Sequence, residues 1–216
     1  MSALVYEDIV DRLATKNPAK RLVVTPLLST AKQVGAGSVD LRLGTEFLET
    51  PRQSTAFLDP LTQGGARSRP SPDRRLYVPL GDEFVLHPGQ FVLGATLEFL
   101  VIPNDIVGQV LSRSSWGRVG LLVATAVAVQ PGFRGVLTLE LVNEGSIPIV
   151  LRPGLRVAQL QLWFSGRPTK NGYSATGKYD APLGPQSNRL ITEGLEREIL
   201  EKITNELHPG RLERGQ

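Results

Sequence analysis

The middle of the chain, from Tyr77 to Phe164, consists of short β-branched or leucine-rich runs separated by Pro, Gly or Asn. This spacing is typical of strands and turns. It predicts strands at Glu83–Leu86, Gln90–Phe99, Ile106–Leu111, Leu121–Ala126, Gly135–Asn143, Ile147–Leu151 and Arg156–Trp163. Turns are expected at Pro88-Gly89, Pro131-Gly132 and Pro153-Gly154, because Pro fixes φ and Gly accepts positive φ. Short antiparallel strands in this number need protected edges, so we expect a mainly β fold, either a closed barrel or a double-sheet jelly roll.

Both ends of the chain show helical rather than strand periodicity. A short amphipathic helix is predicted at the N-terminus from apolar residues at Leu4, Val5, Ile9 and Leu13. A C-terminal helix is predicted after Arg189 from the apolar positions Leu195, Ile199, Ile203 and Leu207. The polar, arginine-rich residues 62–75 are predicted to form a loop. We therefore expect one β domain over 1–189 and a helical extension over 190–216.

Composition narrows the class of protein. The 216 residues are 41% hydrophobic and 21% charged with a net charge of +3, which suits a folded chain with one sizeable core. No apolar run reaches the ~18 residues of a membrane-spanning helix, and Met1–Asp8 lacks the basic start of a signal peptide. We expect a soluble, cytoplasmic protein with no membrane partner. The modest basic excess favours an anionic small ligand over DNA.

The chain contains no cysteine, which excludes disulfides, iron–sulfur clusters, thiolate zinc sites and cysteine nucleophiles. Its two histidines, His87 and His208, both precede Pro-Gly and are interpreted as turn residues. Any chemistry must therefore rest on other side chains.

One candidate anion site follows the strand that ends near Leu111. Ser114 and Ser115 stand at a turn between Arg113 and Arg118. Serine hydroxyls and exposed backbone N–H groups can hold a phosphate, and arginine adds charge in a planar fork. The alternative is that the two serines only cap the turn.

A second candidate is Glu140, which interrupts an apolar and β-branched run from Val136 to Val142. On the two-residue period of a strand it shares a face with Val136, Thr138 and Val142. A carboxylate partly withdrawn from water on that face can move protons. The alternative is a glutamate on the solvent side of the strand.

Several motifs, taken together and in this order, resemble the dCTP deaminase family, which shares a trimeric fold with the dUTPases. They are Gly37–Gly44 (GSVDLRLG), His87–Gly89, Arg113–Leu121 (RSSWGRVGL), Thr125-Ala126, Pro131-Gly132, Leu139–Gly145 (LELVNEG), Leu151–Gly154, Lys178-Tyr179 and Gly184-Pro185. The resemblance covers most of residues 1–189. It implies a distorted jelly roll or β-barrel of the dUTPase-like type, assembled as a homotrimer with its sites between subunits.

The family's chemistry is deamination of dCTP. By resemblance, Glu140 is the general base and acid, while Ser114 and the backbone carbonyl of Ala126 hold the attacking water. Arg118 would stabilise charge near Glu140. No zinc is expected, because a zinc-dependent cytidine deaminase needs a Cys-x-x-Cys pair and this chain has none.

The resemblance also implies a set of substrate-binding residues. This set comprises Arg113, Ser115, Gln130, Phe133, Tyr173, Lys178 and Tyr179. Mg²⁺ would arrive with the triphosphate by bridging its oxygens. Residues 173–189 are expected to form a mobile lid over the nucleotide.

This chain departs from the family at three places. Relatives usually have the sequence Ala-His-Arg-Ile-Asp-Pro-Gly where this chain has residues 126–132, so Gln130 stands at the position of the aspartate. Pro182 replaces a glutamine of the lid, and Gly117 replaces an alanine. In dUTPases that aspartate helps to activate water for diphosphate hydrolysis. We therefore expect dUTP and ammonia as products. The alternatives are a dUTPase-type nucleotide diphosphatase and a non-catalytic nucleotide-binding or regulatory protein on the same fold.

Overall fold

The structure is a computed structural model that describes residues 2–50, 73–123, 128–173 and 181–187, together with positions 198, 199, 202, 203 and 206. Short helices are few in these ranges: α1 (Tyr6–Ala14), α2 (Thr30–Gln33) and α3 (Ser114–Gly117). The strands are β1 (Ser2–Ala3), β2 (Val23–Thr25), β3 (Ser38–Glu49), β4 (Arg74–Tyr77), β5 (Phe84–Leu86), β6 (Phe91–Thr96), β7 (Phe99–Val101), β8 (Ile106–Ser112), β9 (Leu121–Val123), β10 (Ala128–Val129), β11 (Arg134–Gly135), β12 (Thr138–Asn143), β13 (Ile149–Leu151) and β14 (Arg156–Phe164). The expected mainly β fold is confirmed.

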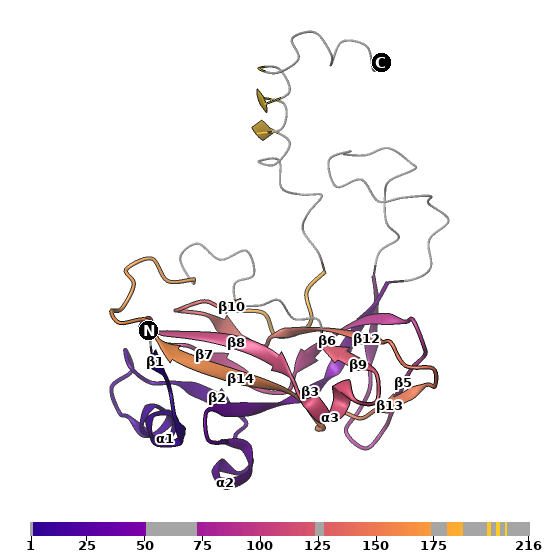
Figure 1. The fold of residues 1–216 in the computed structure, drawn as a ribbon, viewed down its shortest axis with the longest axis horizontal. Helices are drawn as coiled ribbons and strands as arrows, with labels where there is room; N and C mark the ends of the chain where they lie inside the picture. The colour runs from indigo at the N-terminus through magenta and orange to yellow at the C-terminus, as the bar shows by residue number, and fades with distance from the viewer. Residues whose placement is uncertain are drawn as a thin grey trace. The chain divides into compact units, whose positions relative to one another are not determined.

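The largest sheet has the strand order β10-β8-β14-β3-β6-β12-β9, with β1 added beside β14 and β4 beside β3. Its neighbours pair antiparallel, and Figure 1 shows the strands curling across the body of the unit. Two smaller sheets, β11-β7-β2 and β13-β5, complete the strand pairing of the described residues. The strand order places β14 and β3 inside the sheet, and their buried apolar side chains contribute to the core.

Strand β3 is the main element that the apolar pattern did not predict. Asp40 and Arg42 interrupt its apolar residues, so Ser38–Glu49 does not read as a simple buried strand. The interruption is tolerated because both side chains have partners: Asp40 pairs with Arg156, and Arg42 donates to the Gly154 carbonyl oxygen.

The single strand predicted over Gly135–Asn143 is wrong, because the chain bends after Gly135. Gly135 has a φ of +134°, and the next backbone N–H, of Val136, donates to the Pro182 carbonyl oxygen at 2.8 Å instead of to a neighbouring strand. A left-handed φ favours glycine, which lacks a Cβ. The run therefore divides into β11 and β12.

A similar division occurs in the strand predicted over Gln90–Phe99, which the structure separates into β6 and β7. Thr96 accepts the N–H of Leu137 with its hydroxyl and donates that hydroxyl to the Glu98 carbonyl oxygen. The predicted turns at Pro88-Gly89, Pro131-Gly132 and Pro153-Gly154 all carry a glycine with positive φ, as expected.

The N-terminal helix is confirmed as α1, but it begins at Tyr6, so Leu4 and Val5 of the predicted apolar pattern precede it. Ile9 lies in the core, and Asp8 accepts the N–H of Val5 to cap the first turn. Arg12, in its last turn, pairs with Asp105 and lies over the Phe164 ring at 5.0 Å. These contacts tie the helix to the ends of β8 and β14.

Contacts divide the chain into two compact units, one of residues 1–50 and 74–186 and the other of 51–73 and 187–216. The first holds all the named strands and helices. In the second, positions 198, 199, 202, 203 and 206 are helical, which agrees with the helix predicted there, and Ile199 and Ile203 are exposed.

Some expectations fall outside the described residues. Among them are the end of the strand predicted over Leu121–Ala126, His208, and the site residues Ala126, Lys178 and Tyr179. The loop predicted at 62–75 is described only at its end, where Arg74 and Arg75 belong to β4 and not to a loop.

Candidate functional site

Glu140 lies in the middle of β12, which pairs with β6 on one side and β9 on the other. Its register partner on β6 is Leu93. Glu140 is half-buried and alternates with the buried residues Leu139 and Leu141. The predicted two-residue alternation is therefore present, and Glu140 lies on the less buried face of β12.

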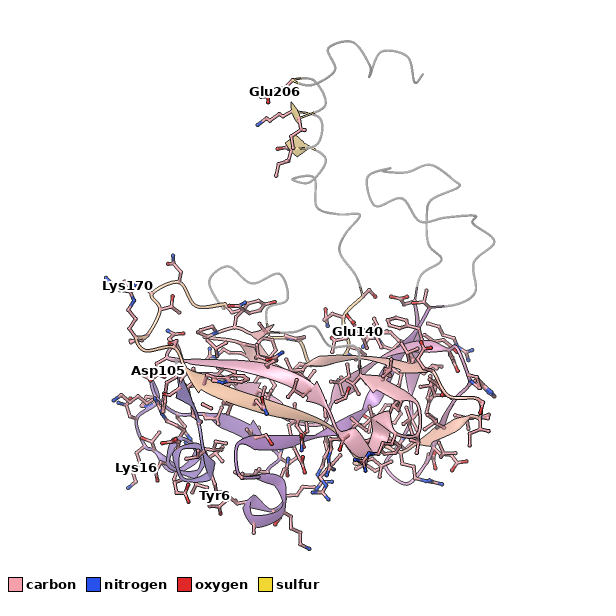
Figure 2. The ribbon with its side chains drawn as sticks, viewed as in Figure 1. Tyr6, Lys16, Asp105, Glu140, Lys170 and Glu206 are labelled. Carbon is pink, nitrogen blue, oxygen red and sulfur yellow. The ribbon has the colours of Figure 1, made fainter. Side chains whose placement is uncertain are left out.

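The segment 181–187 runs beside this strand. The backbone N–H of Gln186 donates to Thr138 Oγ1 at 3.1 Å, and Thr138 precedes Glu140 by two residues on the same face. The buried Pro182 receives the N–H of Val136. Figure 2 marks the position of Glu140 on the sheet. The C-terminal part of the first unit thus packs close to the candidate carboxylate.

The second group of candidates surrounds α3, directly after β8. Ser114, Ser115 and Arg118 are exposed there, whereas the Arg113 side chain is 25% exposed. The helix is anchored through Trp116, whose indole N–H donates to the Arg156 carbonyl oxygen at 2.8 Å. This turn presents two hydroxyls and two guanidinium groups on a fixed backbone.

Asp40 is a polar residue near Arg113 that was not predicted as a site residue. In the sequence it was noted only as part of the motif Gly37–Gly44. Its carboxylate lies 2.9 Å from an Arg156 guanidinium nitrogen and 3.6 Å from Arg113 Nε. The only sequence signal was an acidic residue among the apolar positions of Gly37–Gly44, which by itself does not reveal its partner.

A third group forms where the chain turns at Pro131-Gly132. The rings of Phe133 and Tyr173 have centroids 5.6 Å apart, and the Tyr173 N–H donates to the Pro131 carbonyl oxygen at 2.8 Å. Gln130 is exposed at the start of this turn. The structure therefore brings together Gln130, Phe133 and Tyr173, which are separated by up to forty-three residues in sequence.

The structure does not join all the candidates within one chain. Among the described residues, neither Glu140 nor Arg118 makes a side-chain hydrogen bond or ion pair, so the expected Arg118–Glu140 interaction does not form within this one chain. Ser114 likewise makes no hydrogen bond with Glu140 among the described residues. The roles assigned to these residues stay predictions.

Glu98 is a buried ionisable group outside all three groups. Its carboxylate accepts the Arg42 N–H at 2.8 Å and the Gln33 side-chain amide at 2.8 Å. Burial raises the pKa of the Glu98 carboxyl from 4.5 to about 7, against the opposing effect of these hydrogen bonds and of the Arg42 charge. It holds β3 against the turn between β6 and β7.

The described residues contain no group of three or more His, Cys, Asp or Glu placed to hold a metal ion. None of their helices is long and apolar enough to cross a membrane.

Comparisons with known proteins agree on one family. The family model described as dCTP deaminase-like matches residues 6–165. A dCTP deaminase of Halorubrum lacusprofundi is 43% identical over 186 residues, covering 85% of this chain and 88% of the relative. A relative in Dictyoglomus thermophilum, named dCTP deaminase, dUMP-forming, is 38% identical over 184 residues. The aligned region covers 82% of this chain and 91% of the relative.

The fold also matches a solved structure. The 2'-deoxycytidine 5'-triphosphate deaminase of Agrobacterium tumefaciens superposes with a TM-score of 0.54 at 23% identity, covering 74% of this chain. This chain covers 46% of that protein's chain, so it spans less than half of its length. At this identity the match supports the fold, which agrees with the jelly-roll or barrel type expected from the sequence.

Proposed function

The chain belongs to the dCTP deaminase-like family, and we propose that it hydrolyses dCTP, bound with Mg²⁺, to dUTP and ammonia without zinc. The observation that carries this proposal is the position of Glu140. It is half-buried in the centre of β12, with the segment 181–187 packed beside the same face. That environment suits a carboxylate that exchanges protons with a bound nucleotide base.

In the proposed reaction, Glu140 accepts a proton from water while the water oxygen bonds to C4 of the cytosine ring. Glu140 passes this proton to ring N3. It then takes the remaining hydroxyl proton and delivers it to the exocyclic amino group, which leaves as ammonia when the C4–N bond breaks. The two protons of water are thus accounted for, and C4 becomes a carbonyl.

The remaining candidates have supporting roles in this proposal. Ser114 and the Ala126 carbonyl hold the water, and Arg118 stabilises negative charge near Glu140. Arg113 and Ser115 bind the triphosphate together with residues of the 173–189 segment. The aromatic pair Phe133 and Tyr173 would lie against the sugar or base, with Gln130 at its edge.

We further propose that the enzyme acts as a homotrimer with its sites between subunits. On the face of β12 that carries Glu140, the register places Phe91, Val142 and Leu122 in one row across β6, β12 and β9. Phe91 is 41% and Leu122 45% exposed in the single chain. A row of exposed apolar side chains beside a candidate catalytic carboxylate suits contact with another subunit, which would supply Arg118 and Ser114.

A second candidate product is dUMP, because the relative in Dictyoglomus thermophilum is named dUMP-forming. Gln130 argues against it here, since an amide cannot carry the negative charge that polarises a water for attack on a phosphate. Its position in an exposed turn beside Phe133 still allows a hydrogen bond to the sugar.

The test of the proposed function is the variant Glu140→Gln. The amide keeps the volume of the side chain but cannot accept and return a proton, so ammonia release from dCTP should fall by about 10²–10⁴-fold. Binding of dCTP, measured by calorimetry, should change little.

The matched control is Glu83→Gln, because Glu83 is an exposed glutamate that pairs only with Arg152 in the described structure. This variant should release ammonia at the wild-type rate. Turnover near the wild-type rate in Glu140→Gln would remove Glu140 from the mechanism. A wild-type protein that binds dCTP tightly and releases no ammonia would favour the non-catalytic alternative.

A further inference from the structure

The buried carboxylate of Asp40 lies 3.6 Å from Nε of Arg113, the residue that precedes α3. Asp40 is 8% exposed and belongs to β3, opposite Gln159 of β14 in the strand register. It accepts a hydrogen bond from Arg156 at 2.9 Å and from the Gln159 amide at 3.3 Å, and Arg113 Nε lies at 3.6 Å. One carboxylate therefore faces two guanidinium groups from two different parts of the chain.

These contacts fix how the Arg113 guanidinium is oriented. Its Nε edge faces Asp40, and one of its terminal nitrogens, Nη1, lies 3.5 Å from the Arg156 carbonyl oxygen. The same carbonyl oxygen accepts the indole N–H of Trp116. Within the described residues the other terminal nitrogen, Nη2, makes no hydrogen bond, so this part of the fork is free to bind a ligand oxygen.

The charge of Asp40 is needed for this arrangement. Without it, the guanidinium groups of Arg113 and Arg156 would face one another with no carboxylate between them, and like charges at short range repel. Arg113 would then turn away from β14. Because its side chain is 25% exposed, water offers it many other orientations.

We propose that Asp40 is a positioning residue that holds Arg113 in the orientation that binds the triphosphate. Asp40 does not touch the substrate in this proposal and acts only through Arg113. The inference rests on the proposed function, because it assigns a role within the same site. It predicts an effect on affinity for the phosphates, with little effect on the chemical step at the base.

The test compares Asp40→Asn with the parent protein in two ways. One is the steady-state kinetics with dCTP, and the other is the affinity for dCTP and for deoxycytidine. We expect KM for dCTP to rise about tenfold with kcat changed less than about twofold, since a charge-assisted contact contributes about one power of ten in affinity. Binding is measured in a Glu140→Gln background, where dCTP should be consumed far more slowly. In this background Asp40→Asn should weaken the affinity for dCTP about tenfold. The affinity for deoxycytidine, which has no phosphate, should not change.

A structural role alone would weaken dCTP and deoxycytidine equally, and that result would overturn the inference. A double-mutant cycle tests whether Asp40 acts through Arg113. In an Arg113→Ala background, Asp40→Asn should cause no further loss of dCTP affinity. An additional full tenfold loss there would show that Asp40 does not act through Arg113.

If Asp40→Asn does not fold, Arg113→Lys tests the same geometry. Lysine keeps the positive charge but lacks the planar fork, so it cannot face Asp40 and a phosphate at once. We expect a similar loss of dCTP affinity with deoxycytidine unchanged, and wild-type dCTP affinity would overturn the inference. Absence of ammonia release by the wild type would refute the proposed function, whereas these binding comparisons would still decide the role of Asp40.

Discussion

At the scale of single residues, Glu98 is the ionisable group of the described residues whose pKa is clearly shifted. It is fully buried, and both of its carboxylate oxygens accept hydrogen bonds, one from the Arg42 N–H and one from Gln33. Burial still dominates, and the pKa of Glu98 is raised from 4.5 to about 7. The folded state therefore keeps a proton on this carboxyl over a pH range in which the unfolded chain releases it.

The sign of the pH dependence follows from this difference. Between pH 4.5 and about 7 the folded state binds more protons at Glu98 than the unfolded state, so stability falls as pH rises through this window. Below pH 4.5 this loss of folded-state stability is absent, and above about 7 it is constant at roughly 3 kcal/mol. Urea unfolding of the wild type and of Glu98→Gln at pH 5 and pH 8 measures it.

We expect the wild-type free energy of unfolding, relative to that of Glu98→Gln, to be higher at pH 5 than at pH 8. The comparison removes contributions from the other carboxylates, which are common to both proteins. A difference between the two proteins that is the same at both pH values would contradict the raised pKa of Glu98.

Gln130 gives a second prediction at this scale. Because its amide cannot polarise water as an aspartate does, the reaction should stop at dUTP. Chromatography of the products decides this, with Gln130→Asp as the comparison variant that restores the acid. Accumulation of dUMP and diphosphate by the wild type would show that another residue performs the hydrolysis.

At the scale of elements, the strands with regular apolar alternation were predictable. The β12 run was predicted with Glu140 on one face, and the structure shows that alternation. Strand β3 was not predicted, because Asp40 and Arg42 hide its pattern and their partners lie on β14 and in the turn at Gly154. Such long-range pairing has no local signal in the sequence.

The bend between β11 and β12 was unpredictable for the same reason. It depends on Pro182, which is distant in sequence and accepts the Val136 N–H. The residue types of the candidate site could be read from the sequence. The contact between the Phe133 and Tyr173 rings could not be predicted, because only the fold brings these distant residues together.

The packing of Pro182 against Gly135 gives the prediction at this scale. A Cβ at Gly135 would lie 2.5 Å from Pro182 Cδ, so Gly135→Ala should displace the segment 181–187. We expect a loss of stability of about 1–3 kcal/mol and faster hydrogen exchange at the Gln186 amide, since that N–H is bound to Thr138.

The control for this variant is Gly81→Ala. Gly81 also has a positive φ, of +100°, but a Cβ there would meet nothing within 4 Å. It carries the backbone strain without the collision. Equal exchange at Gln186 in both variants would show that Pro182 packing does not hold the segment.

At the scale of the whole molecule, the row Phe91–Val142–Leu122 gives a prediction about assembly. Light scattering should report about three times the chain mass of 23.5 kDa. Phe91→Glu should disrupt that assembly and with it deamination, because a charge cannot be buried unpaired in an apolar contact.

The control is Leu28→Glu, which changes an apolar side chain that is 62% exposed near α2 and outside this row. It should leave the assembly and the activity intact. A fully active monomer, in either the wild type or the Phe91→Glu variant, would contradict the shared site.

The most direct measurement of the central claim is ammonia release by the purified wild-type chain supplied with dCTP and Mg²⁺. The proposed function predicts one ammonia for each dCTP lost, and the loss of this activity in Glu140→Gln. No ammonia from a folded protein that binds dCTP would contradict it.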